Sequence, residues 1–237
     1  MKRFYTLVST QESPDGGYAV LLDGKSVKTV SRADLIAPNE AIANLVMQEW
    51  AAQSDVIVPD TMPLTQILNT KIDRVRTERE AMQSAVLKYL DTDLLCYFAA
   101  EPEALKTRQE ELWQPWLDWF KKMFGTSLEI TMSLQALSQD VAVYAAVQSY
   151  VSKLDEDCFV VLQLVTSLSG SLVLALAFVQ GQIKAQDVLR AIFVEEDYRD
   201  EIYDSERYGP DPMIEKSRTA KRVDLEAAQN YLKALLL

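Results

Sequence analysis

The stretch Leu162–Gly181, LQLVTSLSGSLVLALAFVQG, is the most apolar part of the chain and decides its fold. Between Gln163 and Gln180 the only polar side chains are four small hydroxyls. A helix that is apolar on every face is either a membrane span or the buried centre of a helical bundle. The residues between the glutamines are fewer than the roughly 20 that a span needs. We therefore predict a buried central helix over Asp157–Val179, in which Gly170 and the serines beside it form a patch for close packing of another helix.

The chain of 237 residues carries a net charge of −11, from 35 acidic and 24 basic residues. Nucleic acids and anionic membrane surfaces both require a cationic face, so this balance disfavours them as the main partner. Hydrophobic residues make up 49% of the chain, which is enough for a substantial core in one large domain or two smaller ones. We expect a folded protein that binds no nucleic acid.

The chain contains no histidine. This removes the usual general base, the commonest metal ligand and every nucleophile that a histidine activates. No CxxC, P-loop or GxGxxG motif occurs either. Cys96 and Cys158 each lie inside an apolar run and are predicted to be buried small hydrophobes in a reducing compartment. We expect neither a cofactor nor a bound metal.

The amino-terminal part is predicted to be rich in strands. β-Branched and aromatic residues, separated by turn signals such as Asp23-Gly24, indicate a meander of at least three strands. These strands are Phe4–Thr10, Tyr18–Leu22 and Lys25–Val30. A helix is expected to follow, with Asn39 as its N-cap and its end near Ser54. Pro59 and Pro63 then predict a rigid linker on extended backbone.

Beyond the linker, apolar residues recur with helical spacing. The expected helices are Leu64–Val75, Glu78–Tyr89, Glu101–Phe124, Val141–Lys153, Asp157–Val179, Ala185–Tyr203 and Leu225–Leu236. Pro115 is expected to kink the helix around it or to start a new one. The predicted fold class is therefore α+β. A small amino-terminal β-rich domain with one helix, residues 1–75, precedes a larger all-α carboxyl-terminal domain, residues 76–237.

The densest cluster of charge lies between residues 195 and 207. Its acidic residues are Glu195, Glu196, Asp197, Asp200, Glu201, Asp204 and Glu206, and its basic residues are Arg199 and Arg207. Three interpretations are open. The cluster is a solvated helix face on which Arg199 pairs with Glu195 or Glu196. Alternatively, it is an acidic patch that attracts a basic or mixed partner surface, or it holds a carboxylate pair for acid-base chemistry.

Short motifs run in a fixed order through nearly the whole chain. They are LLDGKSVKT (Leu21–Thr29), EWAAQ (Glu49–Gln53), PDTMPLT (Pro59–Thr65), Asp73, Tyr89, TDLLCY (Thr92–Tyr97), Gln109, Trp113, Pro115, SGSLVLALA (Ser169–Ala177) and EEDY (Glu195–Tyr198). In this ordered set the chain resembles the ATP synthase assembly chaperones of mitochondria and alpha-proteobacteria, the assembly factor that attends the alpha subunit of the catalytic head. The resemblance implies a domain of strands plus helix followed by a helical domain.

The resemblance also implies a role without catalysis, in which the protein binds the unassembled ATP synthase alpha subunit. It would keep the interfaces of that subunit from aggregating until the beta subunit arrives. Such a surface must release its partner, so a mixed polar and apolar interface is expected. The expected contact residues are Glu195, Glu196, Tyr198 and Arg199. The residues expected to serve the architecture instead are Trp50, Asp93 and Trp113.

Two other functions stay open at this point. One is a carboxylate-based hydrolase near Glu195 and Glu196, which requires a deep pocket with two carboxylates in unequal environments. The other is a peripheral membrane protein that uses Leu162–Gly181. For the chaperone we expect a monomer when free, without stable membrane insertion. The amino terminus MKRFYTLVST lacks a signal-peptide core, so we expect a cytoplasmic protein, or a mature form whose targeting segment has been removed. For eukaryotic relatives the expected location is the mitochondrial matrix.

Overall fold

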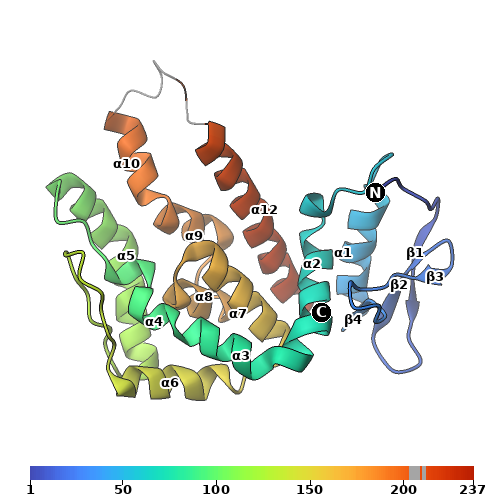
Figure 1. The fold of residues 1–237 in the computed structure, drawn as a ribbon, viewed down its shortest axis with the longest axis horizontal. Helices are drawn as coiled ribbons and strands as arrows, with labels where there is room; N and C mark the ends of the chain where they lie inside the picture. Colours follow the sequence, from blue (N-terminus) through green and yellow to red (C-terminus); the bar gives the residue numbers. More distant parts are fainter. Residues whose placement is uncertain (203–208, 210–211) are drawn as a thin grey trace. The chain divides into compact units, whose positions relative to one another are not determined.

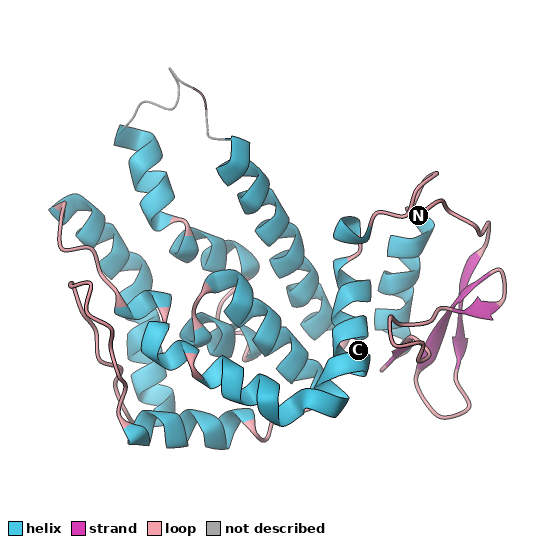
Figure 2. Cartoon of the chain, in the orientation of Figure 1, coloured by secondary structure: helices cyan, strands magenta, loops and turns pink. Residues whose placement is uncertain are grey.

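The computed structural model describes residues 1–202, 209 and 212–237. Figure 1 labels its helices and strands, and Figure 2 shows that the strands (magenta) gather in one small region. This confirms the predicted α+β class. The chain divides into two compact units. The first holds Met1–Arg79, Glu156–Val160 and Ala227–Leu237, and the second holds Glu80–Asp155 and Val161–Glu226. The predicted boundary between residues 75 and 76 stays a prediction.

The first unit begins with an antiparallel sheet. Its strands are β1 (Val8–Glu12), β2 (Tyr18–Leu22), β3 (Lys25–Ser26) and β4 (Ile36–Ala37). Their order is β1-β2-β3, and β4 also pairs with β2. Asp23 and Gly24 turn β2 into β3 with positive φ values of 48° and 79°, the backbone that an Asp-Gly hairpin requires. Only β2 has the predicted bounds, since β1 begins at Val8 instead of Phe4 and β3 ends at Ser26 instead of Val30. β4 is a two-residue pairing too short to leave a periodic pattern in the sequence.

Helix α1 (Glu40–Ala51) packs against β1 and β2. The side chain of Asn39 accepts a hydrogen bond from the backbone N–H of Ile42 at 2.9 Å, which confirms the predicted N-cap. Ile42 and Val46, one turn apart on the buried face, are fully buried. The small sheet therefore gains its core from this helix, because a few short strands bury too little surface to be stable alone.

The proline-rich segment after α1 is not an extended linker. It forms a 3-10 turn, η1 (Pro59–Thr61), and then opens helix α2 (Pro63–Thr70). The Glu49 carboxylate of α1 accepts hydrogen bonds from the backbone N–H groups of Leu64 and Thr65 at 2.7 and 2.8 Å. It thus caps α2 from a different helix. The prediction of extended backbone was wrong because proline also suits the first turn of a helix.

The other helical elements follow in chain order. They are η2 (Lys71–Val75, a π-helical turn), α3 (Arg76–Leu87), α4 (Tyr89–Thr92), η3 (Leu94–Cys96), α5 (Glu103–Phe124), α6 (Val141–Val151), α7 (Glu156–Ser169), α8 (Leu172–Val179), α9 (Ala185–Ile192), α10 (Val194–Ile202) and α12 (Pro212–Ala234). α5 continues through Pro115 without starting a new helix. α12 begins at Pro212 and not at Leu225 as predicted. The sequence did not reveal its first turns, because most of their side chains are exposed and show no apolar stripe.

The apolar stretch forms two helices instead of one. Gly170, with φ of 69°, ends α7, and the hydroxyl of Ser171 accepts from the N–H of Leu174 at 3.1 Å to cap α8. The buried centre is confirmed, since every residue from Leu172 to Phe178 is at most 2% exposed. A Cβ at Gly170 would meet no atom within 4 Å. Gly170 therefore provides the left-handed backbone at the break. The 3-10 turn η3 approaches it closely, since the N–H of Leu94 donates to the carbonyl oxygen of Gly170 at 3.0 Å.

Another predicted helix, over Ala185–Tyr203, is also divided. Phe193 leaves helical geometry, with φ of −107° and ψ of 13°, and separates α9 from α10. Tyr203 lies outside the described residues. None of the helices in the described ranges is long and apolar enough to cross a membrane.

Candidate partner-binding surface

Helix α5 holds the helix that carries the predicted contact residues. Gln109 and Trp113 lie one turn apart on α5, and both are fully buried. The Trp113 indole N–H donates to the carbonyl oxygen of Ala191 in α9 at 2.8 Å. The Gln109 amide oxygen accepts from the N–H of Ala99 at 2.7 Å, and its amide nitrogen donates to a Glu195 carboxylate oxygen at 2.9 Å. Trp113 therefore has the architectural role that was predicted, and Glu195 is fixed by a buried partner.

Arg108 of α5 binds the carboxyl-terminal end of α10. The two terminal nitrogens of Arg108 donate to the two carboxylate oxygens of Glu201 at 2.8 and 2.6 Å. These hydrogen bonds hold the pKa of Glu201 below its usual value and raise the pKa of Arg108. The Arg108 guanidinium also lies 5.2 Å from the centre of the Tyr198 ring. Both charged groups face solvent, so the pair sets the position of α10 more than it stabilises the fold.

Helix α12 contacts α10 from another side. Arg218 donates to Asp197 at 2.7 Å, and its guanidinium lies 4.3 Å from the centre of the Phe193 ring. Its side chain is only 29% exposed. Asp197 is therefore bound to α12, while Glu195 and Glu201 are bound to α5. Three of the acidic side chains of α10 thus have fixed partners on other helices.

The remaining side chains of α10 form its free face, which we define as Glu196, Arg199 and Asp200. These residues follow the i, i+3, i+4 spacing of one helix face. Arg199 is exposed, and Glu196 and Asp200 are half-buried. Within the described ranges, none of the three forms a hydrogen bond or an ion pair through its side chain. The predicted pairing of Arg199 with Glu195 or Glu196 is therefore wrong.

The four predicted contact residues thus divide into two groups. Glu195 and Tyr198 face Gln109 and Arg108 of α5, and Glu196 and Arg199 belong to the free face. The cluster members Asp204, Glu206 and Arg207 lie outside the described residues. Sequence reasoning missed Arg108 and Arg218 as partners of the acidic residues. No local pattern could have revealed them, because Arg108 lies 93 residues from Glu201 along the chain.

The architectural role predicted for Asp93 is also supported by its contacts. Its two carboxylate oxygens accept from the N–H of Leu95 at 3.1 Å and from the N–H of Val173 at 3.0 Å. Full burial raises the pKa of Asp93 to about 6, although hydrogen bonds oppose the shift. The buried thiol of Cys96 nearby has its pKa raised by the same cause. Cys158 is half-buried, so the prediction of its burial was wrong, and the chain has no disulfide within its described part.

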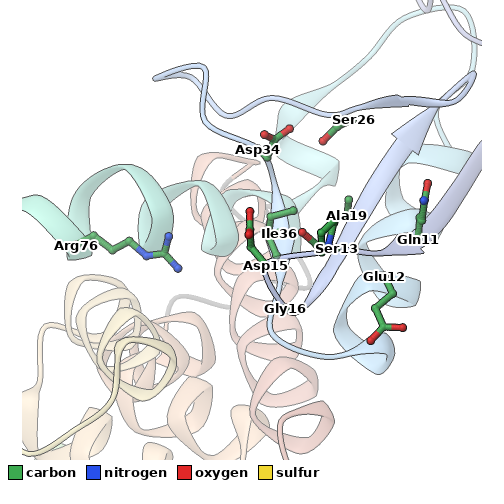
Figure 3. Close-up of a pocket in the computed structure, with 11 residues that line it drawn as sticks. Gln11, Glu12, Ser13, Asp15, Gly16, Ala19, Ser26, Asp34, Ile36 and Arg76 are labelled. Atoms are coloured by element: carbon green, nitrogen blue, oxygen red, sulfur yellow. The ribbon is translucent and has the colours of Figure 1, made fainter.

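Two hollows can be compared with the requirements of an enzyme. One, of about 460 Å³, lies beside the sheet and is drawn in Figure 3, where the Arg76 side chain points from α3 toward the turn that carries Asp15. Two of the four charged side chains that line it are paired, since Asp34 binds Lys28 at 2.6 Å and Arg76 binds Glu156 at 3.1 Å. The other hollow, of about 330 Å³, lies between α9, α10 and α12.

Neither hollow is lined by Glu195 or Glu196. The geometry that a carboxylate-based hydrolase requires is therefore not found at those two residues in either hollow. Among the described residues, no group of three or more histidine, cysteine, aspartate or glutamate side chains is arranged to hold a metal ion. The charged side chains around α10 suit recognition of another charged surface.

Comparison with known proteins agrees with the motif order. The family model described as ATP12 chaperone protein matches residues 2–121. The mitochondrial protein atp12 of Schizosaccharomyces pombe is 22% identical over 197 residues, which is 78% of this chain and 67% of that protein. The mitochondrial protein ATP12 of Saccharomyces cerevisiae is 27% identical over 163 residues, 59% of this chain and 50% of that protein. The chain thus matches between half and two thirds of the length of these curated relatives.

Solved structures are similar over almost the whole chain. The crystal structure of Atp12 from Paracoccus denitrificans superposes with a TM-score of 0.85 at 31% identity, covering 98% of this chain and 97% of that one. A candidate chaperone from Agrobacterium tumefaciens gives a TM-score of 0.88 at 33% identity, covering 99% of this chain and 86% of that one. With this coverage and the family match, the chain belongs to the ATP12 chaperone family of ATP synthase assembly.

Proposed function

We propose that the protein is a non-catalytic chaperone that binds the unassembled ATP synthase alpha subunit and prevents its aggregation until the catalytic head is complete. Family membership supports the general role. The choice of the alpha subunit rests on the motif resemblance. On the same resemblance we place the protein in the bacterial cytoplasm, with the mitochondrial matrix for eukaryotic relatives, and expect a monomer when free.

The free face of α10 is the observation that carries the proposed contact. Cross-helix bonds at Glu195 and Glu201 fix the helix in place, while Glu196 and Arg199 keep their polar atoms unpaired within the described part of the chain. A fixed helix with free charges loses little conformational entropy when a partner docks. Charge contacts of this kind favour rapid and salt-sensitive association, which suits a chaperone that must later be displaced.

The variant Glu196→Lys tests this contact most directly. Glu195→Lys is less informative, because it would also break the bond to buried Gln109 and disturb the packing of α5. Glu80, an exposed residue of α3, provides the matched control, since Glu80→Lys makes the same charge change on another helix of the second unit. Circular dichroism would first establish that both variants fold as the unmodified protein does.

In the assay, denatured ATP synthase alpha subunit is diluted into buffer with the chaperone, and aggregation is followed by light scattering. We expect the unmodified protein and Glu80→Lys to suppress scattering equally. Glu196→Lys should need at least roughly tenfold more protein for the same effect, which corresponds to about 1.4 kcal/mol of binding free energy. Scattering that is unaffected by the unmodified protein would refute the proposed function. Equal suppression by all three proteins would leave the chaperone role and remove the contact from Glu196.

A further inference from the structure

The lining of the hollow between α9, α10 and α12 carries a net positive charge, in a chain whose overall net charge is −11. Three guanidinium groups line it, from Arg190 of α9 and from Arg218 and Arg222 of α12. Two carboxylates, Asp197 and Glu215, lie at the same hollow. The chain as a whole repels anions, so a local excess of arginine is a feature that needs its own explanation.

The three arginines differ in how far their charge is already satisfied. Arg218 donates to Asp197 at 2.7 Å and lies 3.8 Å from Glu215, so its charge is balanced inside the hollow. Arg190 has only a long contact of 3.8 Å to its helix neighbour Asp187, and its side chain is 70% exposed. Arg222 is exposed and has no ion pair among the residues that the structure describes. Arg190 and Arg222 are therefore available to a ligand, whereas Arg218 links α12 to α10 through Asp197.

We propose that this hollow, the arginine groove, binds carboxylate side chains of an acidic segment of the protein partner. A guanidinium offers paired N–H donors in a planar fork that matches the two oxygens of a carboxylate. A groove with arginines on two walls can take such a segment between them, as α9 supplies Arg190 and α12 supplies Arg222. The arginine groove rests on the proposed function only for the identity of the partner, the alpha subunit.

The groove also determines what kind of partner surface fits this side of the protein. Asp197 lines the groove and belongs to α10, whose free face carries Glu196 and Arg199. The two sites therefore adjoin on one helix. A partner that meets both must present basic groups toward Glu196 and acidic groups toward the arginine groove. Such an alternation of charge gives specificity, because a uniformly basic or uniformly acidic surface would meet like charge at one of the two sites.

The test uses the full chain and a fluorescein-labelled peptide of eight residues that alternates glutamate and alanine. Binding is measured by fluorescence anisotropy at low salt, where the negative charge of the whole chain opposes non-specific binding of this probe. The double variant Arg190→Gln with Arg222→Gln removes the two available guanidiniums. The matched control is Lys121→Gln with Lys122→Gln, which removes two exposed positive charges at the end of α5.

We expect the unmodified protein and the lysine double variant to bind the peptide with similar affinity. The arginine double variant should bind at least tenfold more weakly. Absence of binding to the unmodified protein, or an equal loss in both double variants, would overturn the proposal. Displacement of the peptide by inorganic phosphate at matched ionic strength would also overturn it, because the groove would then prefer phosphate to carboxylate. This assay contains no alpha subunit, so its result is separate from that of the aggregation assay.

Discussion

The buried carboxyl group of Asp93 gives the sharpest quantitative prediction. Its pKa rises from an ordinary value of 3.8 to about 6 in the folded protein, chiefly because burial disfavours the charged form. The folded state therefore binds this proton more tightly than the unfolded chain does. It follows that Asp93 contributes stability at low pH, and that this contribution is lost as the pH rises from about 3.8 to about 6. A difference of about two pH units corresponds to roughly 3 kcal/mol in total.

The change that isolates this effect is Asp93→Asn, which removes the titrating group and keeps nearly the same shape. About half of the stability that Asp93 contributes, roughly 1.5 kcal/mol, should be lost as the pH rises from about 5 to about 7.5. This range lies above the isoelectric point of about 4.6, near which the protein would be least soluble. Over this range the unmodified protein should lose that amount of stability relative to Asp93→Asn.

The assay is urea unfolding followed by tryptophan fluorescence, since Trp113 is fully buried in the same unit as Asp93. The quantity to compare is the difference in free energy of unfolding between the two proteins at each pH. Any constant loss from the hydrogen bond that asparagine cannot make to Val173 cancels in that comparison. Asp140→Asn, at the exposed N-cap of α6, is the control and should run parallel to the unmodified protein. A difference between Asp93→Asn and the unmodified protein that stays constant to within about 0.5 kcal/mol would refute the reasoning.

Two further predictions concern the first unit, and both are measured as changes in the free energy of unfolding in urea. Gly17→Ala should destabilise by about 3 kcal/mol or more, because its Cβ would lie 2.5 Å from a carbonyl oxygen of β4, whereas Gly16→Ala should lose only about 1 kcal/mol from its positive φ. Equal losses would show that the turn can shift. Lys71→Ala should lose about 3 kcal/mol, because it leaves the carboxylate of Asp157, whose side chain is only 16% exposed, without its cation. Arg74→Ala, which breaks an exposed pair, should lose less than about 1 kcal/mol, and similar losses for the two variants would contradict this account.

Local features of the fold could be predicted from the sequence because each depends on a few adjacent residues. Asp23-Gly24 forms the predicted hairpin turn, and Asn39 forms the predicted helix cap. Both signals work within one turn of chain, where side-chain hydrogen bonding and access to positive φ decide the backbone. Gly125 likewise ends α5 with φ of 69°, as expected of a glycine that follows a helix.

The helix breaks were harder to predict because composition does not show the sign of φ. Ser169, Gly170 and Ser171 form a small-residue group that suits either helix packing or a helix end. In the structure the serine hydroxyls bond to local backbone groups and the glycine adopts the left-handed region, which identifies a helix end. The break at Phe193 leaves no comparable pattern, since an aromatic residue in an apolar run predicts that the helix continues.

The contacts around α10 could not be predicted because they join distant parts of the chain. Glu195, Asp197 and Glu201 looked alike as members of one acidic cluster. Their partners are Gln109, Arg218 and Arg108, which lie on other helices, α5 and α12. Sequence periodicity reports which residues share a helix face, and it does not report which other helix lies opposite that face. The distinction between fixed and free acidic residues is therefore a result of the tertiary structure.

The same distinction gives physical content to the motif resemblance. The side chain of Glu49 caps α2, that of Asp93 ties η3 to α8, and that of Gln109 bonds to α10, so the polar atoms of these motif residues serve the fold. Their presence in the chain is explained by internal contacts alone. Within the EEDY motif, Glu196 differs, because its carboxylate has no partner among the described residues. Internal contacts account for Glu49, Asp93 and Gln109, but they do not account for Glu196. A partner surface with a basic group opposite it supplies the missing explanation, and the light-scattering assay with Glu196→Lys decides whether that surface belongs to the alpha subunit.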